Sequence, residues 1–179
     1  MGVSATLTGG EKLKKKLKEL QAKLQNGQEL NVGFLENAKY PDGQGVAQVA
    51  AWQEFGTGGI PPRPFFRNMI AKESPHWAHD AAELLRHNRL DAGATLRQMG
   101  KLVKGELQLS INTLTAPPLS PVTLMLRKMW YADKALRITG KTVGEAAARV
   151  AAGESTSGAP TKPLIWTGNM VQSVDYEIK

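Results

Sequence analysis

Residues 46–67 read VAQVAAWQEFGTGGIPPRPFFR. The first half has the apolar spacing of a short helix from Val46 to Phe55, which Gly56 ends. Four of its residues are expected to face a core: Val46, Val49, Ala50 and either Trp52 or Phe55. Three prolines then follow a flexible Gly-Gly pair and favour a stiff, extended path, because each proline restricts its own backbone and that of the residue before it. The stretch therefore predicts a helix, a projecting loop and a second helix that begins near Pro64.

Helices and short strands are also predicted on both sides of this stretch, from apolar spacing and turn residues. They are a strand at 30–35, helices at 65–89, 91–115 and 121–130, a helical turn at 167–173 and a strand at 174–178. The longest apolar stripe, on the helix at 91–115, is Leu96, Met99, Val103, Leu107, Ile111 and Leu114. A break is expected at Ser74-Pro75 and an N-cap at Ser120. The predicted fold class is α+β: a small, mostly antiparallel sheet, with a further partner near Tyr40, packed against several helices and accompanied by an extended loop or arm.

We expect a single domain over residues 1–179, with two special segments. Residues 1–27 should contain a basic amphipathic helix, since four leucines form one stripe over 9–25 and lysines fill the other faces. Residues 131–162 should be a flexible arm or insertion. The alanine, glycine, serine and threonine of that segment bury too little surface to offset a backbone entropy of about 1–2 kcal/mol per ordered residue.

Length and composition exclude several kinds of site. The chain has 179 residues and no cysteine, which excludes disulfides, thiolate metal sites and cysteine nucleophiles. It has no apolar run long enough to span a bilayer and begins without a signal-like segment, so we expect a soluble protein made in the cytoplasm, with no membrane contact. Lys and Arg outnumber Asp and Glu by 23 to 16, and the net charge of +7 favours contact with DNA or with an acidic protein surface.

No motif for catalysis or for a cofactor stands out. Gly140-Lys141-Thr142 lacks the earlier glycine of a phosphate-binding loop. His76, His79 and Glu83 could share adjacent helical turns, but they supply too few ligands for a structural zinc site, and solvated surface histidines are the simpler interpretation. No serine stands in a nucleophile motif. We therefore expect no enzyme activity, no cofactor and no metal ion.

Three segments, in their order along the chain, resemble one protein family. The first segment contains Val32–Leu35, Tyr40–Gly43, Val46–Ala50, Glu54–Thr57 and Ile60–Arg67. The second contains Pro118–Thr123, and the third contains Lys162–Met170 and Ser173–Tyr176. This order resembles that of the tail-completion proteins, also called neck or minor tail proteins, of double-stranded-DNA bacteriophages, and of the related virion-morphogenesis proteins. The first block, up to Arg67, is the most specific part. The lysine-rich helix and residues 129–161 lie outside the resemblance.

The resemblance implies a small α+β fold that assembles into a homo-oligomeric ring at the head–tail junction and has no catalytic activity. The implied partners are further copies of the chain and neighbouring head-closure, portal-adjacent or tail proteins. The implied location is the virion, and the host cytoplasm during assembly. This chain departs from the family at Trp166, where members commonly carry an acidic residue.

The loop at 56–64 is the candidate interface. Its glycines and prolines predict a pre-organised, projecting element, in which an exposed Arg63 offers its guanidinium to a carboxylate or a phosphate. The full set of predicted interface residues is Thr57, Ile60, Arg63, Phe65, Phe66, Arg67 and Trp166. The alternative is that this stretch is only a well-defined helix–loop–helix connection inside one subunit.

The lysine-rich helix allows two interpretations. Its charges form a solvated face around a leucine stripe, or Lys12, Lys15 and Lys16 face packaged DNA in a non-specific contact. The second interpretation leads to an alternative function, a basic DNA-binding accessory protein whose binding would depend sharply on salt. A hydrolase that acts on cell wall or nucleic acid would need a catalytic constellation, which the sequence does not offer.

Overall fold

The computed structural model of the chain describes residues 14–15, 18–19 and 28–179. From residue 28 onward the elements are β1 (Leu30–Phe34), α2 (Val46–Phe55), α3 (Phe65–His87), α4 (Ala92–Thr113), α5 (Pro121–Ala132), α6 (Gly140–Ala151), α7 (Asn169–Gln172) and β2 (Val174–Ile178). Helices and a small antiparallel sheet make this an α+β fold, as predicted. The helix predicted at 9–25 lies mostly outside the described residues, of which 14–15 and 18–19 have helical backbone and exposed side chains.

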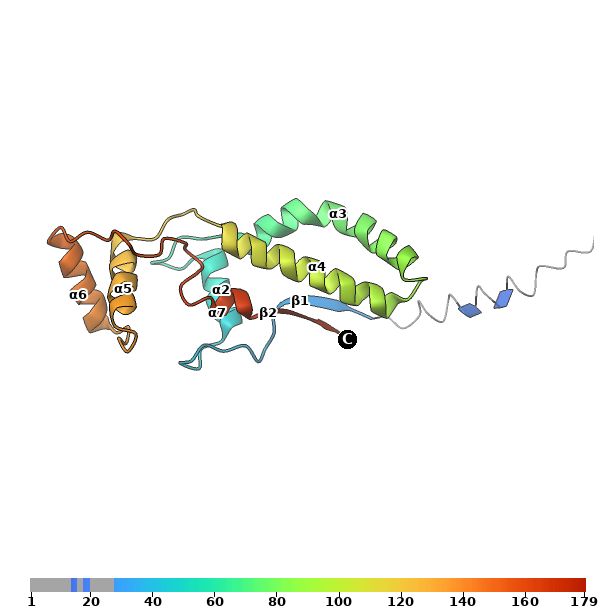
Figure 1. The fold of residues 1–179 in the computed structure, drawn as a ribbon, viewed down its shortest axis with the longest axis horizontal. Coiled ribbons are helices and arrows are strands. Elements are labelled where there is room, and N and C mark those ends of the chain that lie inside the picture. Colours follow the sequence, from blue (N-terminus) through green and yellow to red (C-terminus); the bar gives the residue numbers. More distant parts are fainter. Residues whose placement is uncertain (1–13, 16–17, 20–27) are drawn as a thin grey trace, which may run out of the picture.

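The main body is built in three layers, with α4 between α3 on one side and the two strands on the other (Figure 1). β1 and β2 pair in antiparallel register, with Leu30 opposite Ile178 and Phe34 opposite Val174. The prediction of a further strand near Tyr40 is wrong: within the described part of the chain the sheet contains two strands, β1 and β2. Backbone pairing in that region is limited to one bridge between Lys39 and Gly45.

The apolar stripe predicted on α4 forms the centre of the main core. Met99, Val103, Leu107 and Ile111 are buried, and Leu107 and Ile111 are completely so. They contact buried side chains from α2, α3, α7 and β2. Asp91 caps the helix, because its carboxylate accepts from the backbone N–H of Ala94 at 2.9 Å. The buried stripe of α4 therefore provides the surface against which α3 and the sheet pack.

Two local predictions about α2 and α3 are wrong. Neither Trp52 nor Phe55 of α2 faces the core: they are 37% and 67% exposed, and Glu54 is buried instead. α3 runs through Pro75 without a break. It accommodates the proline by bending, which Figure 1 shows as a bow along the helix. Just after the proline, Trp77 Nε1 donates to Glu106 Oε2 on α4 at 2.9 Å, and this bond helps to hold the second half of α3 in place.

Gly100 lets α4 approach β2 closely, and its replacement by alanine should destabilise the fold. A Cβ at this position would lie 2.7 Å from Cγ of Tyr176, inside van der Waals contact. Overpacking costs about 1–3 kcal/mol, which exceeds the gain of about 1 kcal/mol from better helix propensity. Gly105 lies on the same helix, and a Cβ there would have nothing within 4 Å, so Gly105→Ala is the matched control and should stabilise by about 0.5–1 kcal/mol. Chemical denaturation of the two variants should give opposite signs, and equal signs would contradict this packing.

Residues 140–151 form α6, so the prediction of an extended arm over 131–162 is wrong for this part of the segment. Thr139 begins the helix as its N-cap, in a capping box in which Thr139 N donates to Thr142 Oγ1 at 2.7 Å. Ala146 is completely buried in a second apolar cluster with Met125 and Met129 of α5. The small alanines let the two helices approach closely, and the large side chains of the cluster come mostly from α5. The composition of the segment alone therefore underestimates what it buries.

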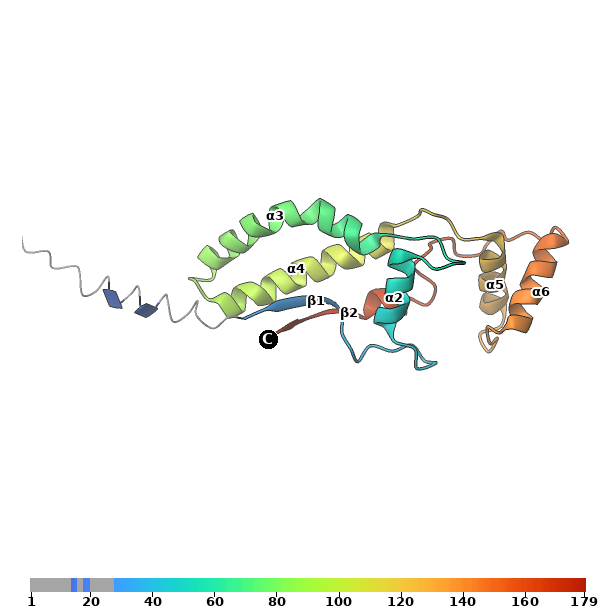
Figure 2. The same ribbon diagram turned by 180° about the vertical axis from the view of Figure 1, so that it is seen from behind.

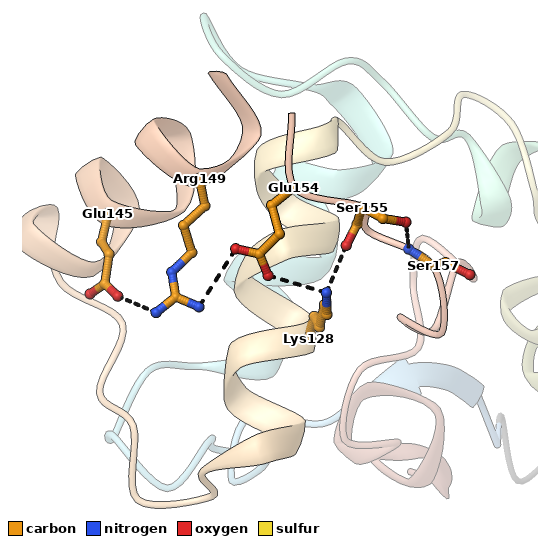
Figure 3. A network of polar contacts seen from close by, with 6 residues as sticks. All are labelled: Lys128, Glu145, Arg149, Glu154, Ser155 and Ser157. Carbon is orange, nitrogen blue, oxygen red and sulfur yellow. Dashed lines mark hydrogen bonds and ion pairs between the residues drawn. The ribbon is translucent and has the colours of Figure 1, made fainter. Parts of the chain in front are cut away.

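Charged side chains also join α5 to the end of α6 (Figure 3). Lys128 Nζ donates to Glu154 Oε1 at 3.2 Å and to the carbonyl of Ser155 at 2.7 Å. Arg149 pairs with Glu145 at 2.6 Å and lies 3.9 Å from Glu154. These side chains are about two-fifths exposed, so each pair contributes little by itself. Together they fix the chain reversal that follows α6.

Candidate functional site

The predicted loop between α2 and α3 is exposed, and its first half forms a short hairpin, which the sequence did not predict. Thr57 N donates to Ile60 O at 2.8 Å and Ile60 N donates back to Thr57 O at 3.2 Å, so the Gly-Gly pair forms the turn. Gly56 begins the loop with φ +78°, and a Cβ there would lie 2.8 Å from Ile60 O. Glycine fits this position because the backbone returns so close to itself. We call residues 57–62 the tip loop; apart from the half-buried Ile60 they are exposed.

Glu54 fixes the base of this loop to the start of α3. Its buried carboxylate accepts from the backbone N–H groups of Phe66 at 2.9 Å and Arg67 at 3.2 Å. It also pairs with Arg67 Nε at 2.7 Å, and the Arg67 guanidinium lies 5.0 Å from the centre of the Phe55 ring. The first N–H groups of a helix have no partner inside it, so a carboxylate there satisfies them and favours the helix dipole. Glu54 is therefore buried because it caps α3.

Arg63 is the second fixed point, and the prediction that it is exposed is wrong. The residue is 4% exposed. Its Nε donates to Pro117 O at 3.1 Å, Nη1 to Gln53 Oε1 at 3.0 Å and Nη2 to Pro118 O at 3.3 Å. Burial lowers the pKa of the guanidinium from its ordinary value. Arg63 thus joins the base of the tip loop to the linker that leads into α5, and the exposed hairpin extends from a clamped base.

A second buried arginine, Arg127, ties α5 to the segment before α7. It is 2% exposed and donates to the carbonyls of Pro160 at 2.9 Å, Lys162 at 2.7 Å and Pro163 at 3.1 Å. Burial is the main cause that lowers the pKa of this guanidinium; Tyr131 raises it and the positive charge of Arg63 lowers it further.

A groove of about 650 Å³ lies between α2 with the 40s turn and α5 with the segment before α7. We call it the Trp166 groove; its walls include Tyr40, Arg127, Trp130, Ile138, Trp166 and Asn169. The Trp130 and Trp166 rings meet edge to face with centres 5.9 Å apart. The Arg127 guanidinium lies 5.6 Å from the centre of the Trp166 ring. The groove therefore combines aromatic walls with a buried positive charge.

Three buried N–H groups in these walls lack an acceptor within the described part of the chain: Arg127 Nε, Trp166 Nε1 and Asn169 Nδ2. Buried donors in folded proteins are nearly always paired, because an unpaired one costs about 1–3 kcal/mol. All three belong to residues that line the Trp166 groove. The three donor atoms are themselves almost fully closed to solvent, so they are unpaired within the walls and not on the open surface of the groove.

The residues predicted as an interface do not form one patch. Thr57, Ile60 and Arg67 lie at or near the surface around the hairpin, whereas Phe65 is 1% exposed in the core, where its ring meets Phe34 edge to face at 6.3 Å. Phe66 is half-buried and packs on the same core. Trp166 lies in the groove, whose walls contain none of the tip-loop residues. The sequence thus predicted the exposed loop but grouped it with residues of the core and of the groove.

Several residues that shape these sites could not be found from the sequence alone. Glu54 caps α3, Arg127 ties α5 to the segment before α7, and Asn169 has an unpaired donor. Trp52 and Phe55 are exposed aromatic residues of α2. Glu54 and Arg127 could have been found from a charged residue that stands among apolar residues in a short helix. Leu126-Arg127 in α5 and Glu54-Phe55 in α2 have this pattern.

The predicted DNA-facing lysines fall largely outside the structure: Lys12 and Lys16 lie outside the described residues, and Lys15 is exposed. His79 Nε2 lies 3.4 Å from Glu83 Oε1, both side chains being well exposed. Over the ranges that the structure covers, no three His, Asp or Glu side chains are placed for a metal ion. In those same ranges no helix has the length and apolar character needed to cross a bilayer.

Comparison with known proteins gives no relative: no family model, no curated protein and no solved structure matches the chain significantly.

Proposed function

We propose that this chain is a structural component of a tailed-bacteriophage virion, a neck or tail-completion protein that joins the tail to the head in a homo-oligomeric ring. The observation that carries the proposal is that the three segments resembling that family meet in space. Arg63 of the first segment donates to Pro117 and Pro118 at the start of the second. The first and third segments pair as β1 and β2 and both line the Trp166 groove.

The exposed surface also supports a role in assembly. Phe55 is 67% exposed, Leu109 57% and Tyr131 46%, on three different helices. Of these, Phe55 lies beside the tip loop, and an exposed apolar side chain next to a rigid, projecting element favours a protein contact there.

The proposed function also accounts for the net positive charge of the chain, +7. A ring that DNA crosses gains from lysines toward its lumen, since they neutralise phosphates without reading sequence. Lys15 and the other lysines of the N-terminal segment are candidates for that contact. If the isolated monomer bound duplex DNA with a steep dependence on salt and never joined particles, the DNA-binding accessory function would replace the neck function.

The proposal predicts weak self-association of the isolated chain. A neck protein that closed its ring too early could not dock, so light scattering at micromolar concentration should show monomers or small oligomers. Larger rings should appear when tails or heads of the same phage are added, because docking raises the local concentration of subunits. A tight dimer that never enters particles would contradict the neck function.

A further inference from the structure

The positive charge of the chain from residue 28 onward is concentrated in one unit, residues 119–162, which contains α5 and α6. This unit carries seven Lys and Arg against three Asp and Glu, a net charge of +4. Residues 28–118 and 163–179 together carry ten Lys and Arg against eleven Asp and Glu, a net charge of −1. Such an uneven division favours an anionic partner for the α5–α6 unit over a charge that only keeps the whole surface soluble.

The α5–α6 unit stands at one end of the molecule, opposite the start of β1 (Figure 1), and Figure 2 shows the same arrangement from behind. The two helices pack chiefly on each other, around an apolar cluster that is separate from the main core. Arg63 and Arg127 fix the two connections between the unit and the main body. The unit is therefore held in place through its connections, and the turn between its helices is not covered by the main body.

This turn and the first two residues of α6 form residues 133–141, which we call the basic turn. All of its residues except Leu136 are exposed. Lys134, Arg137 and Lys141 belong to it, and none of the three forms an ion pair within the described residues. The cations on the flanks of the two helices differ, because Lys128 and Arg149 pair with carboxylates of the unit itself. The basic turn therefore presents positive charge that is not neutralised locally.

Local contacts shape the basic turn. Its one acidic residue, Asp133, accepts from the backbone N–H of Ala135 at 2.9 Å. Lys134 Nζ lies 3.7 Å from the centre of the Trp130 ring and 3.5 Å from that of the Tyr131 ring. These cation–π contacts hold the ammonium at the end of α5 without neutralising its charge.

The start of α6 adds donors beside the three cations. The first turn of α6 contains no acidic residue. The backbone N–H groups of Gly140 and Lys141 have no acceptor within the described residues. Phosphate oxygens accept from such N–H groups and are favoured by the helix dipole. Exposed, flexible cations also neutralise the regularly spaced phosphates of a duplex in any register, whereas a specific pair with a protein carboxylate needs a fixed geometry.

We propose that the basic turn contacts the phosphate backbone of duplex DNA through Lys134, Arg137 and Lys141, without reading its sequence. The inference rests on the proposed function, in which DNA crosses the ring, and it names the element of the described chain that faces the DNA. In that ring the α5–α6 unit lies toward the lumen. The contact is electrostatic, so it weakens steeply as salt displaces the side chains from the phosphates.

The salt dependence of DNA binding tests the contact. A labelled duplex of mixed sequence is titrated with the full-length chain at several salt concentrations, and binding is followed by fluorescence anisotropy. The turn variant combines Lys134→Gln, Arg137→Gln and Lys141→Gln. The matched control combines Lys39→Gln, Arg97→Gln and Lys101→Gln, which removes the same residue types from exposed positions of the main body. All six side chains belong to exposed residues, so both variants should fold, and circular dichroism checks that they do.

We expect the turn variant to lower the slope of log affinity against log salt by about 2–3, since each lost phosphate contact removes about 0.9. The control should lower it by less than about 1, because its positions contact no phosphate. Equal changes in the two variants would overturn the inference, since the loss of net charge alone would then explain both. An unchanged slope in the turn variant would overturn it as well.

Two further arms separate the inference from its rivals. A poly-glutamate chain is titrated in place of the duplex; binding as tight as that of DNA, with the same loss in the turn variant, would replace DNA with an acidic protein surface. Incorporation into particles tests the neck function separately. A chain that enters particles but binds DNA independently of the basic turn would reject this contact and leave the neck function standing. A chain that binds DNA through the basic turn but never enters particles would keep the contact and reject the neck function.

Discussion

Replacing Arg63 with alanine is expected to lower the free energy of unfolding by about 3–4 kcal/mol, because several charge-assisted hydrogen bonds and a buried side chain are lost together. The side chain is 4% exposed and donates to Gln53, Pro117 and Pro118. Alanine leaves these acceptors without a donor and opens a cavity where the tip loop meets the linker to α5. Chemical denaturation of the purified variant measures the loss.

Two further variants define what Arg63 does. Arg63→Lys should lose about 2 kcal/mol, because one ammonium cannot reproduce the forked geometry of three donors. Arg149→Ala is the control for removing an arginine; its side chain is 44% exposed and pairs with an exposed carboxylate, so the loss should be at most about 1 kcal/mol. Equal stability of Arg63→Ala and Arg149→Ala would show that Arg63 does not clamp the base of the tip loop.

The second large effect is expected at Glu54, whose replacement by alanine should cost about 2–3 kcal/mol through the lost cap and the unpaired donors it leaves. Alanine removes the acceptor of Phe66 N, Arg67 N and Arg67 Nε. The start of α3 should fray, and the tip loop should lose its fixed base. Denaturation gives the stability, and hydrogen exchange at Phe66 and Arg67 reports the fraying directly.

The controls for Glu54 separate the cap from the charge. Glu54→Gln keeps one acceptor oxygen at the same place and should lose about half as much, since neutral hydrogen bonds are weaker than charge-assisted ones. Glu145→Ala removes an exposed carboxylate from a helix pair and should change stability by about 0.5 kcal/mol or less. Hydrogen exchange at Phe66 that is unchanged in Glu54→Ala would contradict the capping role.

The elements with a strong period could be predicted from the sequence. α2 and β2 have the predicted bounds, and α4 differs from its prediction by one residue at the start and two at the end. The α4 stripe corresponds to a buried face, and the alternating Leu30, Val32 and Phe34 of β1 are half-buried and pack against the same core. Ser120 also caps α5 as predicted, its hydroxyl accepting from Thr123 N at 3.2 Å.

Features that depend on distant partners could not be predicted in the same way. α6 was missed because alanine carries little apolar surface, and its partners Met125 and Met129 lie on another helix. Arg63 was placed outside because a charge in a proline-rich loop is usually solvated, whereas two of its three acceptors, Pro117 and Pro118, are some 55 residues further along the chain. A single sequence gives no sign of such a pairing.

The candidate site also contains one part that could be predicted from the sequence and one part that could not. The exposed loop could be predicted because its glycines and prolines act locally, through the positive φ of Gly56 and the stiff path after Ile60, whereas the pairing of Thr57 with Ile60 was not predicted. The Trp166 groove could not, because its walls come from the 40s turn, α2, α5 and the segment before α7. Only their meeting in space places Trp130, Trp166 and the buried Arg127 in the walls of one groove.

Electron microscopy of phage particles that carry a tagged copy of this chain tests whether it is a neck component. The particles should come from a lysate in which the tagged gene replaces the original, with a label bound to the tag. We expect label in a ring at the junction of head and tail, and unjoined heads and tails when the gene is inactivated. Label absent from particles, together with normal joining in the inactivated lysate, would contradict the neck function.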